Sequence, residues 1–266
     1  MLTILLHSSK TMRAGAEVSN TVHTPALTVP SNDLANYLQT LTIEQIASSM
    51  KLSRAMAERT HRLIANWQVH PTHTLPAIDA FIGDIYSGLQ VASFSQADRA
   101  YAHDHLIILS GLYGALRALD NIQPYRLEMG YRLPDEPYRD LYRFWGDRIA
   151  QCIAPQSIIL NLSAVEYTRA VFPHLSDNTI IITPKFLTMN HKTNEPAFVT
   201  VHAKIARGAF AHWLITHRVQ TTDQLKDFDE LNYRFDARLS TPEQPVFVCR
   251  NFGGIGMSVR LTQQSK

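Results

Sequence analysis

Gly111 and Gly114 lie three residues apart in the segment Leu-Ser-Gly-Leu-Tyr-Gly-Ala-Leu-Arg-Ala-Leu-Asp, which covers residues 109–120. Glycine permits a tight turn and the close approach of a ligand, because it has no side chain. Residues 115–119 are strong helix formers, and the amides at the start of a helix favour phosphate and other anions. The segment predicts a phosphate-binding turn with Arg117 directed toward the anion, similar to the glycine turn with which helix-hairpin-helix modules hold nucleic acid. The alternative is a packing corner of the fold, which shows the same glycine spacing.

Basic side chains elsewhere in the chain are candidates to contact the same anion. Lys10 follows the first apolar run, where we expect a strand to end and a binding loop to begin. Lys204 and Arg207 lie in the first turn of a predicted helix, where the helix dipole opposes a positive charge. Their position is explained either by anion binding or by the solvation of ordinary surface charge. Arg126 belongs with them, because it lies beside an aromatic residue and close to a glycine.

Four carboxylates lie in segments rich in glycine and aromatic residues and offer an acid–base pair: Asp84, Asp120, Glu128 and Glu166. We take Asp84 and Glu166 as the candidate catalytic residues, the second because it follows a predicted strand. Tyr86 and Tyr167 lie within two residues of them and would stack on a base. The alternative is structural, with Asp84 capping a turn and Glu166 paired with an arginine.

No metal site and no cofactor is predicted. His70 and His73 lie in a proline-containing loop with no cysteine nearby and no carboxylate before Asp79. The glycine segment lacks the Lys-Ser or Lys-Thr of a Walker loop and the G-x-G-x-x-G pattern of dinucleotide-binding proteins. The nucleophile motif G-x-S-x-G and the redox motif Cys-x-x-Cys are also missing.

The composition limits the class of protein. The chain has 266 residues, 45% of them hydrophobic, with a formal net charge of +2. This length suits one large domain or two small ones, and no apolar run reaches the roughly eighteen residues of a membrane span. Because the net charge is small, a nucleic-acid surface would have to arise from local clustering of cations. Cys152 and Cys249 are too few for a disulfide framework, so we expect a cytoplasmic protein.

Helix signals dominate the first half of the chain and strand signals the second. Thr42 and Gln45 form a capping box, and Ser53 and Ser95 suit helix starts. The predicted elements are strands over 1–6, 157–162, 179–183, 197–201 and 245–249, helices over 53–67, 96–106, 140–153 and 204–219, and a loop over 70–76. Because the elements follow no regular βαβ spacing, we expect an irregular α/β or α+β fold, with a mixed sheet surrounded by helices. We expect a single domain over 1–252 and a flexible tail over 253–266.

Six blocks of residues stand out by their composition and order. They are Phe81-x-Gly-Asp-x-Tyr-x-Gly-Leu89, Leu109-Ser-Gly-Leu-Tyr-Gly-x-Leu-Arg-x-Leu-Asp120, Gln123-Pro-Tyr-Arg-Leu-Glu-Met-Gly130, Leu141-Tyr-x-Phe-Trp-Gly146, Asn161-Leu-x-x-x-Glu-Tyr167 and Ala203-Lys-x-Ala-Arg-Gly208. Together with Ser-x-Lys-Thr at residues 8–11, they resemble the YaaA peroxide-stress family. The chain departs from the family pattern at Ile82, where lysine is usual, at Ala118, where proline is common, and at residues 7–9, which replace Ser-Pro-Ala. The missing cation at position 82 weakens the expected binding of DNA.

The resemblance implies a cytoplasmic bacterial protein that protects cells during hydrogen-peroxide stress. It also implies an association with limiting free intracellular iron, and sequence-independent binding of duplex or distorted DNA through a positively charged cleft. The family fold is a single α/β domain with a helix-hairpin-helix element, which we place near residues 105–120. The candidate DNA- or phosphate-binding residues are Lys10, Gly111, Gly114, Arg117, Arg126, Lys204 and Arg207.

Two functional hypotheses follow. In the first, the chain is a non-enzymatic DNA-binding protein of the stress response, without membrane association. In the second, it is an enzyme that acts on a small nucleotide or a damaged base, with Asp84 or Glu166 transferring a proton. Direct iron sequestration is disfavoured, because the sequence offers no pair of Glu-x-x-His motifs from facing helices and no cysteine cluster.

Overall fold

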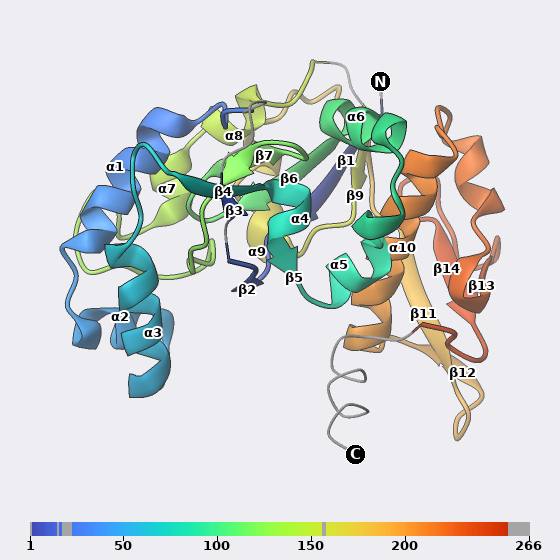
Figure 1. Cartoon of the computed structure of the whole chain (residues 1–266). Helices are drawn as coiled ribbons and strands as arrows, with labels where there is room; N and C mark the ends of the chain where they lie inside the picture. The colour runs from blue at the N-terminus through green and yellow to red at the C-terminus, as the bar shows by residue number, and fades with distance from the viewer. Residues whose placement is uncertain (1, 15, 18–22, 156–157, 255–266) are drawn as a thin grey trace.

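The main sheet lies at the centre of the molecule (Figure 1). The computed structural model describes residues 2–14, 16–17, 23–155 and 158–254. Five strands follow the order β10-β9-β1-β6-β7. β1 (Leu2–His7) lies in the middle and runs parallel to β6 (Leu106–Ser110) on one side and to β9 (Ile158–Asn161) on the other. These strands are mostly apolar and buried, which is typical of a parallel sheet covered on both faces. Their carboxyl ends meet at one edge of the sheet, here called the carboxyl edge.

The glycine segment forms a β-hairpin at the border of this sheet. β7 (Gly114–Arg117) runs antiparallel to β6, so the prediction of a helix over residues 115–119 is wrong. Residues 115 and 116 are buried and paired with β6, and this tertiary contact overrides their helix propensity. The helix-hairpin-helix element expected near residues 105–120 is therefore not formed by that segment. β10 (Ile181–Ile182) completes the sheet, parallel to β9.

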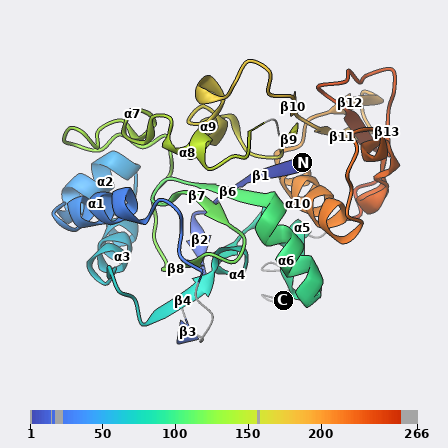
Figure 2. The same ribbon diagram turned by 90° about the horizontal axis from the view of Figure 1, so that it is seen from above.

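A helical hairpin lies elsewhere, on one side of the main sheet. α2 (Ile43–Met50) and α3 (Arg54–Ala65) are joined by three residues, beginning with Lys51 in the left-handed region at φ 52°. The capping box of Thr42 and the cap formed by Ser53 are confirmed. α1 (Thr28–Gln39) packs with this pair, and the three helices lie together in both views (Figures 1 and 2).

A smaller sheet lies on the opposite side, in the order β12-β11-β14-β13 (Figure 2). Its strands are β11 (Lys185–Asn190), β12 (Glu195–Ala197), β13 (Tyr233–Phe235) and β14 (Val246–Cys249). The long helix α10 (Thr200–Thr216) packs against it through a cluster of aromatic rings that includes Phe186, Phe210 and Phe247. The strand predicted over 197–201 is wrong for most of its length, because helix α10 begins at Thr200.

Two glycines bring α10 against α5 (Asp84–Leu89) with the backbones in contact. A Cβ at residue 208 would lie 2.7 Å from Leu89 N and 2.9 Å from the carbonyl carbon of Ile85. A Cβ at residue 88 would lie 2.8 Å from Ala209 N. Ordinary contacts of a Cβ atom are 3.4–4 Å, so only glycine at these positions allows this crossing.

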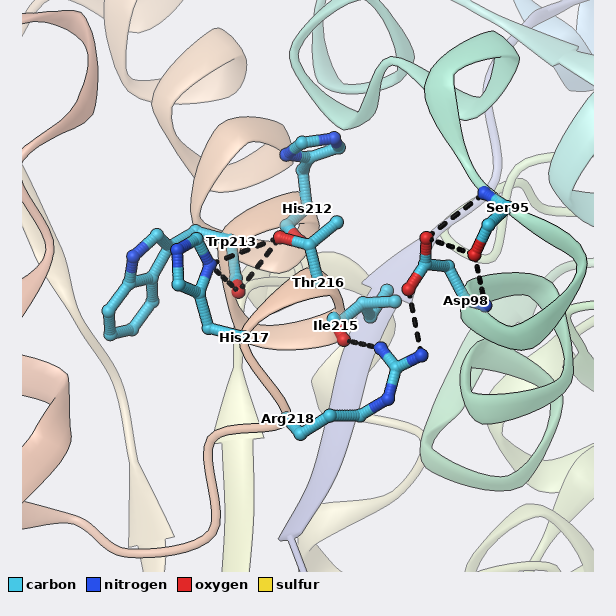
Figure 3. A network of polar contacts seen from close by, with 8 residues as sticks. All are labelled: Ser95, Asp98, His212, Trp213, Ile215, Thr216, His217 and Arg218. Atoms are coloured by element: carbon cyan, nitrogen blue, oxygen red, sulfur yellow. Dashed lines mark hydrogen bonds and ion pairs between the residues drawn. The ribbon is translucent and has the colours of Figure 1, made fainter.

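The carboxyl end of α10 is tied to α6 (Gln96–His105). Arg218 forms an ion pair with Asp98 at 2.8 Å, donates to the carbonyl of Ile215, and lies over the ring of Tyr101 at 4.5 Å. Asp98 in turn is held by Ser95, the cap of α6, as Figure 3 shows. The predicted helix start at Ser95 is thus confirmed. Together with the glycine crossing, this network fixes α10 relative to the main sheet.

The remaining elements are short. They are β2 (Thr11–Met12), β3 (Ala16–Glu17), β4 (His73–Pro76), α4 (Ala77–Ala80), β5 (Phe81–Ile82), β8 (Asn121–Ile122), α7 (Leu141–Trp145), α8 (Arg148–Gln151), α9 (Val165–Thr168) and 3-10 turns at Val91–Ser93, Phe172–His174, Asp223–Asp227 and Glu230–Asn232. The helix predicted over 140–153 is split at Gly146, which has φ 52°. The loop predicted over 70–76 contains β4. The mixture of helices with parallel and antiparallel strands confirms the α/β class.

Two further expectations concern the ends of the chain and membranes. Most of the expected flexible tail, residues 255–266, lies outside the described residues. Within the described ranges, no helix is both long and apolar enough to cross a membrane.

Candidate functional site

Polar side chains gather at the carboxyl edge of the three parallel strands. His7 ends β1 and Ser8 follows it, Ser110 ends β6, and Ser163 follows β9. β1 is the point at which the connections of the sheet diverge, because β6 lies on one side of it and β9 on the other. In open α/β sheets, ligands bind at this edge beside such a point. The carboxyl edge is therefore the candidate functional site.

Four hydroxyl groups at this edge form a chain that ends on Glu128. Ser110 Oγ and Tyr125 OH are 2.6 Å apart, and Tyr125 also hydrogen-bonds with Ser8. Ser8 Oγ donates to Tyr167 OH at 3.2 Å, and Tyr167 OH donates to Glu128 Oε1 at 3.1 Å. Burial raises the pKa of both tyrosines, so both remain neutral donors. The last two donations, from Ser8 and from Tyr167, are directed toward the carboxylate of Glu128.

Two opposing effects act on the pKa of Glu128: burial raises it and a nearby cation lowers it. The Glu128 side chain is 13% exposed, and its Oε2 lies 3.3 Å from Nζ of Lys10, which is 55% exposed. Burial raises the pKa of Glu128, the Lys10 charge opposes that shift, and the charge of Glu166 adds to it. The net effect is a raised pKa, so Glu128 holds a proton more readily than an ordinary glutamate. That is the property of a general acid.

Glu166, on α9, and Glu128 border the same cleft. Oε1 of Glu166 accepts the backbone N–H of Gly130 at 2.8 Å, and a Cβ at residue 130 would lie 3.0 Å from that oxygen. The absence of a side chain at 130 permits this approach. The cleft has a volume of about 700 Å³ and is bordered by both glutamates, by Lys10 and, from the helical hairpin, by Ser48 and Lys51.

His7 is neutral and its tautomer is fixed. Its Nδ1 accepts the backbone N–H of Ala164 at 3.1 Å, so the ring proton lies on Nε2. Burial, together with the charges of Arg207 and Lys204, lowers the pKa of His7 to about 3. The imidazole stacks on the ring of Tyr167 at 5.0 Å between centroids. His7 therefore offers one N–H donor, close to two cations.

Arg207 and Lys204 lie on α10, close enough to His7 for their charges to lower its pKa. Arg207 is half-buried, and burial lowers the pKa of its guanidinium. Among the described residues it has no carboxylate and no hydrogen-bond acceptor. Lys204 is exposed and likewise forms no ion pair within the described ranges. A guanidinium partly removed from water without an acceptor is less favourable than a hydrated one, and a ligand that supplies an acceptor would offset this cost.

The structure brings together most of the residues predicted for the site. Lys10, Glu166 and Tyr167 lie at the carboxyl edge, with the two cations of α10 near His7. Arg126 donates to the carbonyl of Lys10 at 3.4 Å. Its Nε is buried and has no hydrogen-bond partner among the described residues.

The two glycines and Arg117 do not belong to this site. A Cβ at residue 111 would lie 3.0 Å from the carbonyl carbon of Leu127, and one at residue 114 would lie 2.9 Å from Trp145. The glycine segment is therefore the packing corner, and protein fills the space where an anion was expected. Arg117 donates to the carbonyls of Asp104 and Cys152, at 2.9 and 3.4 Å. The expectation that it points toward an anion held by the glycine turn is wrong.

Asp84 and Tyr86 lie on α5, apart from the glutamates. Tyr86 OH donates to the carbonyl of His7 at 3.0 Å and supports the end of β1. Oδ1 of Asp84 is buried without a hydrogen-bond partner, and no described contact joins Asp84 to Glu166. The acid–base pair that the geometry offers is Glu128 with Glu166, in place of Asp84 with Glu166.

His7 and Ser8 were not among the predicted site residues, and Glu128 was predicted only as one of four carboxylates that could form an acid–base pair. The sequence signal of His7 and Ser8 is their position directly after an apolar run. Within the described residues, no group of three or more His, Cys, Asp or Glu side chains is arranged to hold a metal ion.

Comparison with known proteins connects this geometry to a family. The sequence model described as peroxide stress protein YaaA matches residues 2–239. The chain belongs to this family. A relative from Salinispora tropica, named UPF0246 protein, is 54% identical over 259 residues, which cover 97% of this chain and 98% of the relative. The match to the YaaA family includes every strand of the main sheet and both glutamates of the cleft.

Proposed function

We propose that this member of the YaaA family acts in the response to peroxide stress by binding DNA at the carboxyl edge of its main sheet. The observation that carries the proposal is Arg207, a half-buried guanidinium without an acceptor among the described residues. A DNA phosphate supplies the acceptor that it needs, and charge-assisted contacts of this kind are strong.

Neighbouring groups favour the same ligand. Lys204 lies one turn before Arg207 on α10, and the Nε2–H of His7 is a neutral donor beside them. These groups present donors and positive charge, as a phosphate requires.

The helical hairpin offers a second contact surface. Lys51, at its turn, and Ser48, on α2, border the cleft that Lys10, Glu128 and Glu166 also line. Hydroxyls and lysines are common partners of the sugar-phosphate backbone, and they carry no sequence information. Together with Arg207 and Lys204, these groups support binding of DNA independently of its sequence.

A salt-titrated binding assay tests the proposal. The full chain is mixed with intact and bubble-containing duplexes over a range of salt concentrations, alongside Arg207→Met. The variant removes the charge and keeps much of the side-chain volume. We expect its affinity to fall about 10- to 100-fold, as for loss of a hydrogen bond to a charged group. The slope of log affinity against log salt should become shallower by about 0.9 for each phosphate that the variant no longer neutralises.

Arg238→Met is the matched control. Arg238 lies beyond β13 and its side chain is 90% exposed, so its replacement should leave both affinity and slope unchanged. Equal affinity and slope in Arg207→Met and in the unaltered protein would show that Arg207 does not contact phosphate. No binding by the unaltered protein at low salt would refute the proposed function as a whole.

A further inference from the structure

We propose that the cleft hydrolyses the N-glycosidic bond of a nucleotide in DNA, with Glu128 as the general acid and Glu166 as the general base. The inference rests on the proposed function, because the cations near His7 would hold the phosphate of the same nucleotide. It goes further by assigning a reaction to the carboxylates that line the cleft.

The first argument is the presence of these carboxylates. Phosphate binding requires positive charge and donors, and a carboxylate beside a phosphate repels it. Nevertheless two glutamates border the cleft, and each is held in place by hydrogen bonds, Glu128 from Tyr167 and Glu166 from the amide of Gly130. A protein that only bound the DNA backbone would gain nothing from this arrangement.

The second argument is the difference between the two carboxyl groups. Glu128 is almost buried and lies close enough to Glu166 for the charge of Glu166 to favour the protonated form of Glu128. Acid–base hydrolysis needs two carboxyl groups in different surroundings, of which one donates a proton and the other accepts one. Glu166 is placed to act as the base, because the N–H of Gly130 fixes its Oε1 and its side chain borders the cleft.

The third argument is the spacing between the anion-binding groups and the acid. The ring of Tyr167 stacks on His7, and its hydroxyl donates to Glu128. One tyrosine side chain thus separates the donors near Arg207 from the carboxyl group of Glu128. In a nucleotide, the sugar likewise lies between the phosphate and the glycosidic nitrogen.

The proposed reaction consumes one water molecule. Glu166 removes a proton from water as the water oxygen forms a bond to C1′ of the sugar. The bond between C1′ and the base nitrogen breaks, and its electron pair stays on the nitrogen, which takes the proton of Glu128. The products are the free base and a sugar with a hydroxyl group at C1′. The proton on Glu166 then returns through solvent to Glu128, and no oxidant or reductant is required.

Tyr167 is a positioning residue in this scheme. Its hydroxyl fixes one oxygen of Glu128 and leaves the other, beside Lys10, at the cleft. Donation to a carboxylate stabilises the ionised form, so Tyr167→Phe should raise the pKa of Glu128. The acid must be protonated to act, so the fall of activity at high pH should move to higher pH in this variant. A purely structural role for Tyr167 would lower the rate without shifting the pH at which activity falls.

The experiment measures base release from defined DNA. Duplexes and bubbles that carry one 8-oxoguanine, thymine glycol or uracil, and unmodified duplexes, are incubated with the full chain. Free base is detected by mass spectrometry, and abasic sites are detected by cleavage with alkali. We expect base release from at least one of these probes. Glu128→Gln and Glu166→Gln should each slow it about 100-fold or more, the usual contribution of acid–base catalysis. DNA binding should persist in both variants.

Glu243→Gln, at an exposed glutamate before β14, is the control and should keep the full rate. DNA that is bound but releases no base from any probe would overturn the assignment and leave the proposed function intact. Strand scission without release of base would also overturn it, because a different bond would then be broken. A failure of binding would instead refute the proposed function, so the two failures are distinguishable.

Discussion

The crossing of α5 and α10 predicts a large effect for a single methyl group. In Gly208→Ala the new Cβ would fall 2.7 Å from Leu89 N and 2.9 Å from the carbonyl carbon of Ile85, and closer still to the Ile85 oxygen. All three atoms belong to the backbone of α5, so no side-chain rotation can relieve the overlap. The two helices must move apart, and α10 carries Lys204 and Arg207 with it.

Two opposing contributions determine the magnitude. Alanine is favoured over glycine in a helix interior by about 0.5–1 kcal/mol. Overpacking of a well-packed core costs about 1–3 kcal/mol and occasionally more. We place this case at the upper end, because the obstacle is backbone and the crossing is buried. The net loss of unfolding free energy should be about 2 kcal/mol, which lowers Tm by roughly 4–8 °C for a chain of this size.

Thermal and urea unfolding of three variants test this reasoning. Val201→Ala, at an exposed position of α10, is the control and should change stability by no more than about 0.5 kcal/mol. Gly88→Ala meets the same crossing from the other helix and should behave like Gly208→Ala. The double variant should cost less than the sum, because one separation of the helices accommodates both methyl groups. An unchanged or raised Tm in Gly208→Ala, as helix propensity alone predicts, would refute the close backbone contact.

Two further changes probe other buried groups. The pKa of His7 falls from 6.5 to about 3 on folding, so the stability that comes from its neutral form is complete above pH 6.5 and is lost as pH falls. Between pH 7 and pH 5 this loss of unfolding free energy is about 2 kcal/mol. The variant His7→Asn keeps an acceptor for the N–H of Ala164 but cannot take up a proton. In urea unfolding at the two pH values, we expect the variant to lack this pH-dependent loss. Equal pH slopes in both proteins would contradict the assignment. Trp145→Phe leaves the buried carbonyl of Gly111 without the indole N–H that donates to it at 3.0 Å, and should cost about 1–3 kcal/mol in the same assay. A cost below about 0.5 kcal/mol would show that this hydrogen bond contributes little.

Local signals in the sequence were sufficient where the local chain decides the structure. The capping box of Thr42, the cap at Ser95 and the apolar run of β1 are read from a few neighbouring residues, and all three are confirmed. The prediction of a helix over 115–119 was wrong because the backbone of this segment pairs with β6, and helix propensity takes no account of such a distant partner. The glycine crossing of α5 and α10 joins residues 120 positions apart, and no local pattern indicates it.

The same division applies to the site. Lys10 and Glu166 were identified because each follows a strand, and parallel strands bring their ends together. Glu128 follows no strand of the main sheet, and its burial, its contact with Lys10 and the hydroxyl chain behind it arise only in the folded chain. Arg117 looked similar to the other cations in sequence, but two carbonyl groups already occupy its guanidinium.

The central place of β1 has a consequence for the order in which the chain folds. Ile4 pairs with Leu106 and Leu2 with Ile158, so both neighbours of β1 lie far downstream of it in the chain. Synthesis proceeds at roughly 5–20 residues per second, so β6 follows β1 after on the order of 5–20 s, and β9 follows later still. During that time a strand of almost unbroken hydrophobicity is without its sheet, which favours aggregation and capture by chaperones. The carboxyl edge, and every residue of the site placed on it, takes shape only after β9 has been synthesised.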